Sequence, residues 1–524
     1  MANEKKINVI LDGKKVEAFD GERLASIIKR NGLFISAPCY HESLTETGHC
    51  GLCLVGARRK SSDDFTVLFA CTATAKDGME IDTRHPNALQ ERNKLLFMSL
   101  LSHPMDCSKC NKVGDCFLHK IATQTKFRGF SRIKNGELND VEYTSFGEKI
   151  LFDSCKCIGC QLCIRFFRDI LNEDKLGMFL NTAGYKEVGL YPGKTLDGNY
   201  SINVVDLCPA GALISKKSLF QPFDFELMRT PSISTGSSTG VNTYLMHDGE
   251  KVFRIVPRRN QYVNDCWMPD SERDEYENIN KHTRLRRVIY NGARSQLEHA
   301  ISHIVETLKN TGADVVCSGK MSLEEQFILH ELLSSVVSDI HFLKKTQKSD
   351  GFLISDDASP NFNGALLTGL IKNGEEVHNL SRLNEKIKNR QTKAIIIIDE
   401  EIFDYGVSYV IPDDVKMFYI GTRYEKTAKR SIVNIPISTV FEKTGTFINK
   451  DWRLQKFYKA IKPPTNDVLP LWRILSFILD VYFTQDTKFF RLEDLWKAMT
   501  KEISELKDVD LKNLSESGIL LKKY

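Results

Sequence analysis

Long hydrophobic runs are absent from this 524-residue sequence. The longest apolar stretches lie at 95–101, 394–398 and 474–479, and each is well short of the roughly 18 residues that cross a membrane. We therefore expect any membrane association to go through a partner protein. The first residues show no apolar signal segment and no Arg-rich, acid-free presequence, which predicts a cytoplasmic or mature matrix protein.

An excess of one charge sign is also missing, because 72 basic and 68 acidic residues leave a formal net charge of only +4. Charge therefore gives no support to nucleic-acid binding. A G-x-G-x-x-G dinucleotide fingerprint is absent as well, so NADH is expected to bind to another chain. The length predicts roughly three to five domains.

Cysteine is nearly absent from the second half of the chain. Twelve of the 14 cysteines lie between Cys39 and Cys208, and Cys266 and Cys317 stand alone. Such crowding in a large chain without secretory features favours metal ligation over disulfides. We interpret Cys266 and Cys317 as ordinary cysteines, and Cys317 as a core residue at the end of a strand.

Hydrophobic periodicity predicts different folds in the two halves. Alternation at 7–11 and 15–18, a turn at 12–14 and a helix at 24–30 are typical of the opening of a β-grasp domain. A second helix is expected at 84–101. Beyond about residue 284, helical patterns such as 296–308 alternate with apolar runs, which predicts a parallel α/β domain; the predicted buried strands are 314–317, 351–354 and 394–398.

The first cysteine set follows the predicted β-grasp opening with the spacing C-x10-C-x2-C-x17-C, and consists of Cys39, Cys50, Cys53 and Cys71. Gly48 and Gly51 lie among these residues. Backbone N–H groups of such a Gly-rich loop can point at inorganic sulfides, which favours a [2Fe-2S] cluster. A structural zinc site is the alternative, but a zinc ribbon usually has two C-x2-C pairs.

The second set has the spacing H-x3-C-x2-C-x5-C and consists of His103, Cys107, Cys110 and Cys116. One histidine among three cysteines also suits zinc, so this motif alone leaves both possibilities open.

The third set is C-x2-C-x2-C completed by a distant C-P: Cys157, Cys160, Cys163 and Cys208. This pattern is typical of a ferredoxin-type [4Fe-4S] cluster, and it favours a cluster at the second set too. Cys155 breaks the spacing, and we expect it not to be a ligand; the alternative is that it takes the place of Cys157.

The order of these motifs resembles the large iron–sulfur subunit of respiratory complex I, the G or 75 kDa type of NADH:quinone oxidoreductase. The resemblance is specific through the phrase Cys208-Pro209-Ala210-Gly211-Ala212 and weaker beyond it. There it depends on short phrases such as 230–233, 254–258 and 442–449. It implies a multidomain protein of α+β and α/β class.

The resemblance implies five segments. These are a β-grasp [2Fe-2S] ferredoxin-like domain at 1–80, a helical His/Cys [4Fe-4S] segment at 81–125, a [4Fe-4S] ferredoxin-like domain at 126–222, a small β-rich segment without a cluster at 223–283, and a vestigial molybdopterin-oxidoreductase-like α/β domain at 284–524. Some relatives hold a further [4Fe-4S] cluster in the fourth segment. The matching positions here are Ser234, Ser237, Val241 and Pro269, which cannot supply thiolates, so this cluster should be absent.

The resemblance also implies a function. The chain would relay electrons from a flavin- and NADH-binding subunit through two [4Fe-4S] clusters toward quinone-side iron–sulfur subunits, as a peripheral subunit on the cytoplasmic face of the inner membrane, or on the matrix side in mitochondria. We expect no catalytic side chain, flavin or molybdenum on this chain. An alternative is the iron–sulfur subunit of an NAD-linked hydrogenase or of a formate dehydrogenase.

Overall fold

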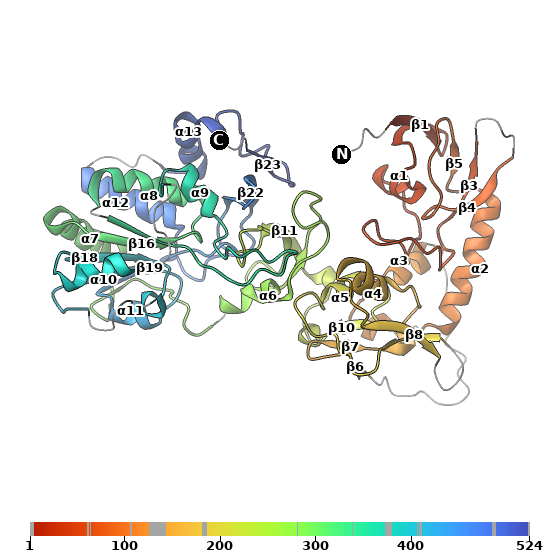
Figure 1. Ribbon diagram of the computed structural model, residues 1–524, viewed down its shortest axis with the longest axis horizontal. Helices are drawn as coiled ribbons and strands as arrows, with labels where there is room; N and C mark the ends of the chain where they lie inside the picture. The colour runs from red at the N-terminus through yellow and green to blue at the C-terminus, as the bar shows by residue number, and fades with distance from the viewer. Residues whose placement is uncertain are drawn as a thin grey trace. The chain divides into compact units, whose positions relative to one another are not determined.

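The computed structural model divides the chain into two compact units, Met1–Glu226 and Leu227–Tyr524 (Figure 1). The structure describes residues 5–59, 62, 64–104, 107–124, 143–180, 186–279, 281–337, 339–372, 380–405, 407, 411–484 and 489–521.

The first unit opens with a five-stranded mixed sheet of order β2-β1-β5-β3-β4, formed by β1 (Lys6–Leu11), β2 (Lys14–Phe19), β3 (Leu54–Arg58), β4 (Thr66–Phe69) and β5 (Glu80–Asp82). Strand β1 alternates strictly between exposed and buried residues, so that Ile7, Val9 and Leu11 face the core. Helix α1 (Leu24–Arg30) contributes Leu24 and Ile28 to the same core. The predicted hairpin and following helix are confirmed.

The rest of the first unit contains one long helix, α2 (Pro86–Ser102), and a series of short elements. The short elements are η1 (Cys107–Lys109), α3 (Phe117–Gln124), β6 (Thr144–Ser145), β7 (Ile150–Phe152), η2 (Ser154–Lys156), α4 (Leu162–Arg165), η3 (Phe166–Ile170), β8 (Leu176–Leu180), β9 (Lys186–Leu190), α5 (Asn203–Leu207), β10 (Leu213–Ser215), η4 (Lys216–Ser218) and η5 (Asp224–Glu226). Strands β10, β7 and β6 form one small antiparallel sheet, and β8 and β9 form a hairpin. The predicted boundary at residues 125 and 126 lies outside the described residues.

One hydrophobic cluster joins the loops that carry all three cysteine sets. Its buried members come from the loop before β3, from α2 and α3, and from the segment after α5: Leu52, Leu96, Leu100, Leu118, Ile121, Ala122 and Ala210. Ile158 packs against it from the third set. The three sets therefore share a single core. Shortening one of its side chains would leave a cavity next to the loops of all three sets.

The second unit contains a seven-stranded sheet of order β15-β14-β20-β19-β18-β16-β17. Its strands are β14 (Ile289–Tyr290), β15 (Ala293–Arg294), β16 (Asp314–Ser318), β17 (Asp339–Leu343), β18 (Ala394–Ile398), β19 (Lys416–Gly421) and β20 (Val433–Pro436). The five strands from β20 to β17 run parallel. In β18, Ile396 and Ile398 belong to the core on one face, and Ile395 and Ile397 belong to the core on the other. Burial on both faces explains the continuous apolar run.

Helices cover both faces of this sheet. Figure 1 shows α7 (Leu297–Thr311), α8 (Leu323–Val336) and α12 (Leu471–Phe483) on one face, and α10 (Ser381–Lys388) and α11 (Lys426–Arg430) on the other. The remaining helices are α6 (Asp270–Arg273), α9 (Phe362–Leu367) and α13 (Leu492–Glu502). This arrangement confirms the predicted mixture of helices and strands; likeness to molybdopterin oxidoreductases stays a prediction. Along the described residues, no helix is both long and apolar enough to cross a membrane.

The predicted strand at Gly351–Ile354 is wrong. These residues form a loop, because Gly351 adopts a φ of +74° and the Asp350 carboxylate accepts hydrogen bonds from the backbone N–H groups of Phe352 and Ile354 at 2.9 and 3.0 Å. An aspartate that caps backbone donors in this way competes with strand pairing.

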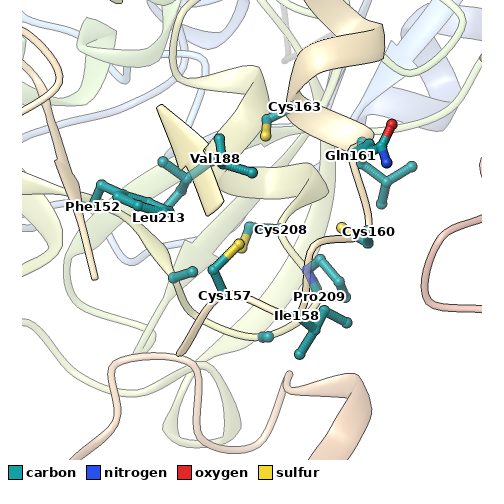
Figure 2. Close-up of a pocket in the computed structure, with 13 residues that line it drawn as sticks. Phe152, Cys157, Ile158, Cys160, Gln161, Cys163, Val188, Cys208, Pro209 and Leu213 are labelled. Carbon is teal, nitrogen blue, oxygen red and sulfur yellow. The ribbon is translucent and has the colours of Figure 1, made fainter. Parts of the chain in front are cut away.

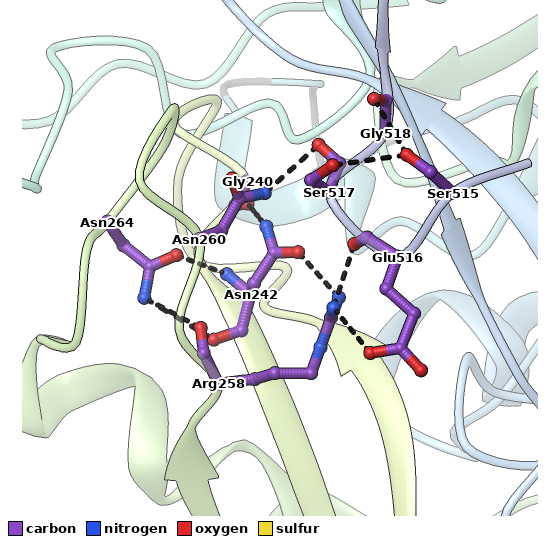
Figure 3. Close-up of polar contacts among 9 residues, drawn as sticks. All are labelled: Gly240, Asn242, Arg258, Asn260, Asn264, Ser515, Glu516, Ser517 and Gly518. Atoms are coloured by element: carbon purple, nitrogen blue, oxygen red, sulfur yellow. Dashed lines mark hydrogen bonds and ion pairs between the residues drawn. The ribbon is translucent and has the colours of Figure 1, made fainter. Parts of the chain in front are cut away.

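Two further three-stranded sheets complete the second unit. One is β11 (Met228–Ile233), β12 (Asn242–His247) and β13 (Val252–Pro257), and the other is β21 (Gly445–Ile448), β22 (Arg453–Phe457) and β23 (Ile519–Leu520). Figure 3 shows how the first is tied to the segment before β23: the Arg258 guanidinium donates to the Glu516 carbonyl oxygen at 2.8 Å, and the Asn260 amide donates to that of Ser517 at 3.1 Å. Residues 242–260 and the end of the chain thus pack as one body.

Candidate metal centres

The first cysteine set lies in the loops around β3 and β4. Its sulfur atoms form two close pairs, Cys39 with Cys50 at 3.3 Å and Cys53 with Cys71 at 3.3 Å, and Cys39 also contacts Cys71. Two irons, each held by two thiolates from the protein, require this pairing. The spacing motif could not reveal which cysteines pair.

The sulfur–sulfur contact within each pair favours the thiolate form of one of its two cysteines. The side-chain contact between Cys39 and Cys50 holds the pKa of Cys39 far below its usual value and raises the pKa of Cys50. Likewise the Cys71 thiol lowers the pKa of Cys53. The thiolate is the form that binds metals, so each pair already stabilises one ligand in its metal-binding form.

Two glycines shape the loop that carries Cys50. Gly48 and Gly51 have φ values of +61° and +66°, a region that costs other residues steric strain. A β-carbon on Gly51 would also approach Cδ1 of Leu95 to 2.6 Å. Glycine is therefore required there both for backbone conformation and for packing against α2.

The second set follows α2. His103, the residue directly after that helix, is buried, and Cys107 lies in η1. Burial raises the pKa of Cys116, with a further contribution from the neighbouring thiols of Cys110 and Cys107, which places these three sulfurs in one neighbourhood.

The third set surrounds a pocket. Figure 2 shows the sulfurs of Cys157, Cys160, Cys163 and Cys208 around it, with apolar side chains such as Phe152, Ile158, Val188 and Leu213 completing the lining. Burial raises the pKa of Cys157 to about 11 and raises the pKa values of Cys160 and Cys163 as well. These thiols are protonated at neutral pH until a metal displaces their protons. Cys155 is not among the lining residues.

The spread of the ligand atoms favours clusters over single zinc ions. Four thiolates around one zinc lie about 3.8 Å from one another, as follows from tetrahedral Zn–S bonds. Among the described residues, no three ligand atoms of the cysteine sets lie mutually within 4.8 Å. Thiolates, with a histidine in the second set, are donors that iron–sulfur clusters take, so the chemistry of the three sets fits such clusters.

The third set makes contacts with each of the other two. The second and third sets adjoin because Sγ of Cys116 lies 3.6 Å from the carbonyl oxygen of Pro209, and a β-carbon on Gly211 would meet Sγ of Cys110 at 3.1 Å. The first and third sets adjoin through Arg165, whose guanidinium donates to the carbonyl oxygens of Cys39 and Cys160 at 2.5 and 3.1 Å. Sequence reasoning missed Arg165, because an arginine after a cysteine motif gives no sign of being buried.

In the second unit, the positions that matched the additional cluster are occupied by a hydrogen-bonded network. Ser234 donates to the Glu275 carboxylate at 2.9 Å, Ser237 donates to Thr239 at 3.3 Å, and Val241 is fully buried. Cys266 is the only cysteine at 227–277, and Cys317 is buried in β16. Burial raises the pKa of Cys317, as expected for a core thiol.

A further group of potential ligands lies at the amino ends of β16 and β17. Asp314, Asp339 and His341 come together there. The Lys386 ammonium forms an ion pair with Asp314 and lies 3.6 Å from Asp339, while Thr392 donates to Asp314 at 2.8 Å. The lysine supplies the positive charge that a metal ion would bring, so this group is an ion-pair network.

Comparison with known proteins gives three matches to family models. Residues 4–86 match a 2Fe-2S iron–sulfur cluster binding domain, residues 147–214 match the ferredoxin-like domain of NADH-quinone oxidoreductase subunit 3, and residues 227–277 match the NDSU1/NuoG-like 4Fe-4S domain of NADH-ubiquinone oxidoreductase. The predicted ferredoxin-like and [2Fe-2S] domains are thereby supported.

Curated relatives carry consistent names. The G-type subunit of NADH-quinone oxidoreductase from Rickettsia felis is 28% identical over 340 residues, which are 64% of this chain and 50% of the relative. The NADH-ubiquinone oxidoreductase 75 kDa subunit of Reclinomonas americana is 31% identical over 350 residues, 65% of this chain and 49% of the relative. The chain thus spans about half the length of the curated relatives it matches.

Among solved structures, an NAD+-reducing [NiFe]-hydrogenase in the H2-reduced state aligns with 42% of this chain and 91% of its own chain, at 20% identity and a TM-score of 0.36. At this TM-score the match carries no inference. The names of the curated relatives and the family models agree with the order of the motifs, and the chain is similar to the G-type, or 75 kDa, iron–sulfur subunit of NADH:quinone oxidoreductase.

Proposed function

We propose that this chain holds one [2Fe-2S] and two [4Fe-4S] clusters and serves as an electron-transfer subunit of NADH:quinone oxidoreductase, respiratory complex I. The observation that carries this proposal is the arrangement of the first unit, where three ligand sets of the expected types adjoin one another around one core. The names of the curated relatives support the assignment to this complex.

The proposed ligands follow the three sets. The [2Fe-2S] cluster is bound by Cys39, Cys50, Cys53 and Cys71, one [4Fe-4S] cluster by His103, Cys107, Cys110 and Cys116, and the other by Cys157, Cys160, Cys163 and Cys208. The paired sulfurs of the first set and the ring of sulfurs around the pocket of the third set support this assignment.

The clusters supply one-electron redox chemistry, while the protein sets their separation and surroundings. Because the third set adjoins both others, clusters held by these residues would lie close enough for electrons to pass between the third set and each of the other two. The apolar lining of the third pocket keeps water away from its ligands, which influences reduction potential. No side chain need act as an acid, a base or a nucleophile.

The partners follow from this role. A flavin- and NADH-binding subunit delivers electrons, and quinone-side iron–sulfur subunits receive them. The chain is peripheral, on the cytoplasmic or matrix side, and reaches the membrane only through these partners. It binds no nucleic acid, flavin or molybdenum, and the domain at 284–524 is a scaffold of molybdopterin-oxidoreductase type. The hydrogenase and formate dehydrogenase alternatives are not favoured, because the curated relatives described above are NADH-quinone and NADH-ubiquinone oxidoreductase subunits.

Metal analysis tests the proposal directly. The chain purified without oxygen should contain about ten iron and about ten acid-labile sulfide, from one two-iron and two four-iron clusters. About fourteen iron would mean that 227–277 also holds a cluster, whereas stoichiometric zinc with little iron would disprove the proposal. NADH should reduce the clusters only after the flavin subunit is added; reduction by NADH, formate or hydrogen without it would contradict the role of relay.

A further inference from the structure

The side chain of Arg165, at the end of α4, is among the most deeply buried charged groups in the first unit. Its exposed fraction is 1%, and its donors all reach backbone carbonyl oxygens. One terminal nitrogen donates to Cys39 and Cys160, the other donates to Thr45, and Nε donates to Gln161 at 3.3 Å. The guanidinium fork therefore fastens the loop of the first cysteine set to that of the third.

Arg165 has no carboxylate counter-ion among the described residues. The nearby Asp169 pairs with Arg168 at 2.8 Å and accepts from the Thr45 hydroxyl at 2.7 Å. A buried cation without an opposite charge is strongly unfavourable. Besides the Asp169 carboxylate, which acts on Arg165 without forming an ion pair with it, the anions that can balance this one are the thiolates of Cys39 and Cys160 and whatever anionic group those thiolates hold.

A second contact shows that the two loops meet at this point. The ring Nε2 of His49, the residue before Cys50, lies 3.8 Å from the β-carbon position of Gly159, the residue before Cys160. Gly159 has a φ of +64°, and a larger residue there would be strained. The third set thus approaches the first set at two points around Cys160. Gly159, before Cys160, lies beside His49, and Arg165, after Cys160, contacts Cys39.

We infer that Arg165 is a positioning residue shared by the [2Fe-2S] centre and the [4Fe-4S] centre of the third set, an inference that rests on the proposed function. Its fork holds the two centres at a fixed separation. Its charge stabilises the reduced, more negative form of each, which raises both reduction potentials. In a transfer between these two centres, one electron leaves one centre, which is oxidised, and enters the other, which is reduced. No proton moves, because the guanidinium stays protonated.

The test compares three variants of the full chain, purified without oxygen. Arg165→Gln removes the charge and keeps a polar side chain, and Arg165→Lys keeps the charge but loses the planar fork. Arg168→Gln is the matched control, since the Arg168 side chain is 54% exposed and makes an ion pair at the surface. The readouts are iron content, the reduction potential of each centre from redox titration followed by electron paramagnetic resonance, and the magnetic interaction between the two reduced centres.

Arg165→Gln should retain iron and lower both potentials together, by at least tenfold in each reduction equilibrium, or about 59 mV for a one-electron couple. Arg165→Lys should keep potentials near those of the wild type but change the magnetic interaction, because the separation is no longer fixed. Arg168→Gln should change neither. If Arg165→Gln instead loses iron, loss from both centres at once supports the clamp.

Other results would overturn the inference: unchanged potentials in Arg165→Gln, a shift or an iron loss confined to one centre, or an equal effect of Arg168→Gln. Absence of iron and sulfide from the wild-type chain would refute the proposed function itself. The two failures are therefore distinguishable.

Discussion

Gly51 packs directly against Leu95 of α2, so closely that a β-carbon at residue 51 would lie 2.6 Å from Cδ1 of Leu95. We predict that Gly51→Ala weakens the [2Fe-2S] centre, because alanine would suffer both this clash and a φ of +66°, which costs about 1–2 kcal/mol. Spin quantitation of the reduced [2Fe-2S] signal should show lower occupancy, and the signal should be lost at a lower temperature.

A double variant separates the two causes. Adding Leu95→Ala should restore part of the occupancy, since it removes the clash but not the strain. The control is Gly13→Ala, where φ is +80° and nothing lies within 4 Å of the β-carbon position. Equal losses in Gly13→Ala and Gly51→Ala would show that close packing at residue 51 is unimportant.

His103 should be an iron ligand of the second set. His103→Cys should retain a four-iron cluster with an altered spectrum and potential, because thiolate replaces imidazole, whereas His103→Ala should lose or convert the cluster. Iron analysis and low-temperature electron paramagnetic resonance distinguish these outcomes. His119, an exposed residue of α3, provides the control His119→Ala. An unchanged second-set spectrum in His103→Ala would exclude the histidine as a ligand.

The Asp314–Lys386 pair should make the second unit sensitive to acid. Burial tends to raise the pKa of Asp314, but hydrogen bonds from His341, Lys386 and Thr392 outweigh it and hold that pKa below the usual value. The resulting stabilisation is present above the unfolded-state pKa of about 3.9 and is lost as the pH falls through the lower folded-state pKa. Lys386→Met should cost about 3 kcal/mol at neutral pH, because a buried carboxylate loses its cation, and much less in acid.

Tryptophan fluorescence during urea unfolding measures this effect, since all four tryptophans of the sequence lie in the second unit. The exposed pair of Lys393 and Asp414, 3.5 Å apart, gives the control Lys393→Met, which should cost less than about 1 kcal/mol. An equal cost for Lys386→Met at pH 7 and below pH 3 would contradict the electrostatic explanation.

Arg258 should anchor the end of the chain. Its buried guanidinium donates to the Glu516 carbonyl and to the Asn242 side chain, so Arg258→Met should cost about 2 kcal/mol and expose the segment before β23 to limited proteolysis. The matched control Glu516→Ala removes only an exposed carboxylate 3.5 Å away and keeps the backbone acceptor. Rapid cleavage in Glu516→Ala but not in Arg258→Met would contradict this role of the Arg258 hydrogen bonds and would point to the Glu516 carboxylate instead.

The sequence predicted features that leave a periodic or compositional trace. The hairpin and helix at 6–30 alternate or repeat in hydrophobicity, and the continuous apolar run Ala394–Ile398 predicted the buried strand that the structure shows. The strand predicted at Gly351–Ile354 is wrong because an apolar run forms a strand only when another strand pairs with it. Here the Asp350 carboxylate accepts the hydrogen bonds of the local backbone N–H groups instead.

The geometry of the candidate site was less predictable than its residues. Spacing identified the cysteines, but it could not show that Cys39 pairs with Cys50, or that Arg165 connects Cys39 with Cys160. These relationships depend on contacts between residues more than 100 positions apart or on the fold of a loop, and hydrophobic period carries no information on either.

The position of the third set has a consequence for biogenesis. On the proposed assignment, the third set is the last to acquire all its ligands during translation, because Cys208 follows every other ligand along the chain. The first and second sets therefore have all their ligands before the third set is complete. A chain interrupted before residue 208 would lack the fourth ligand of the third set, and with it the centre that adjoins both others.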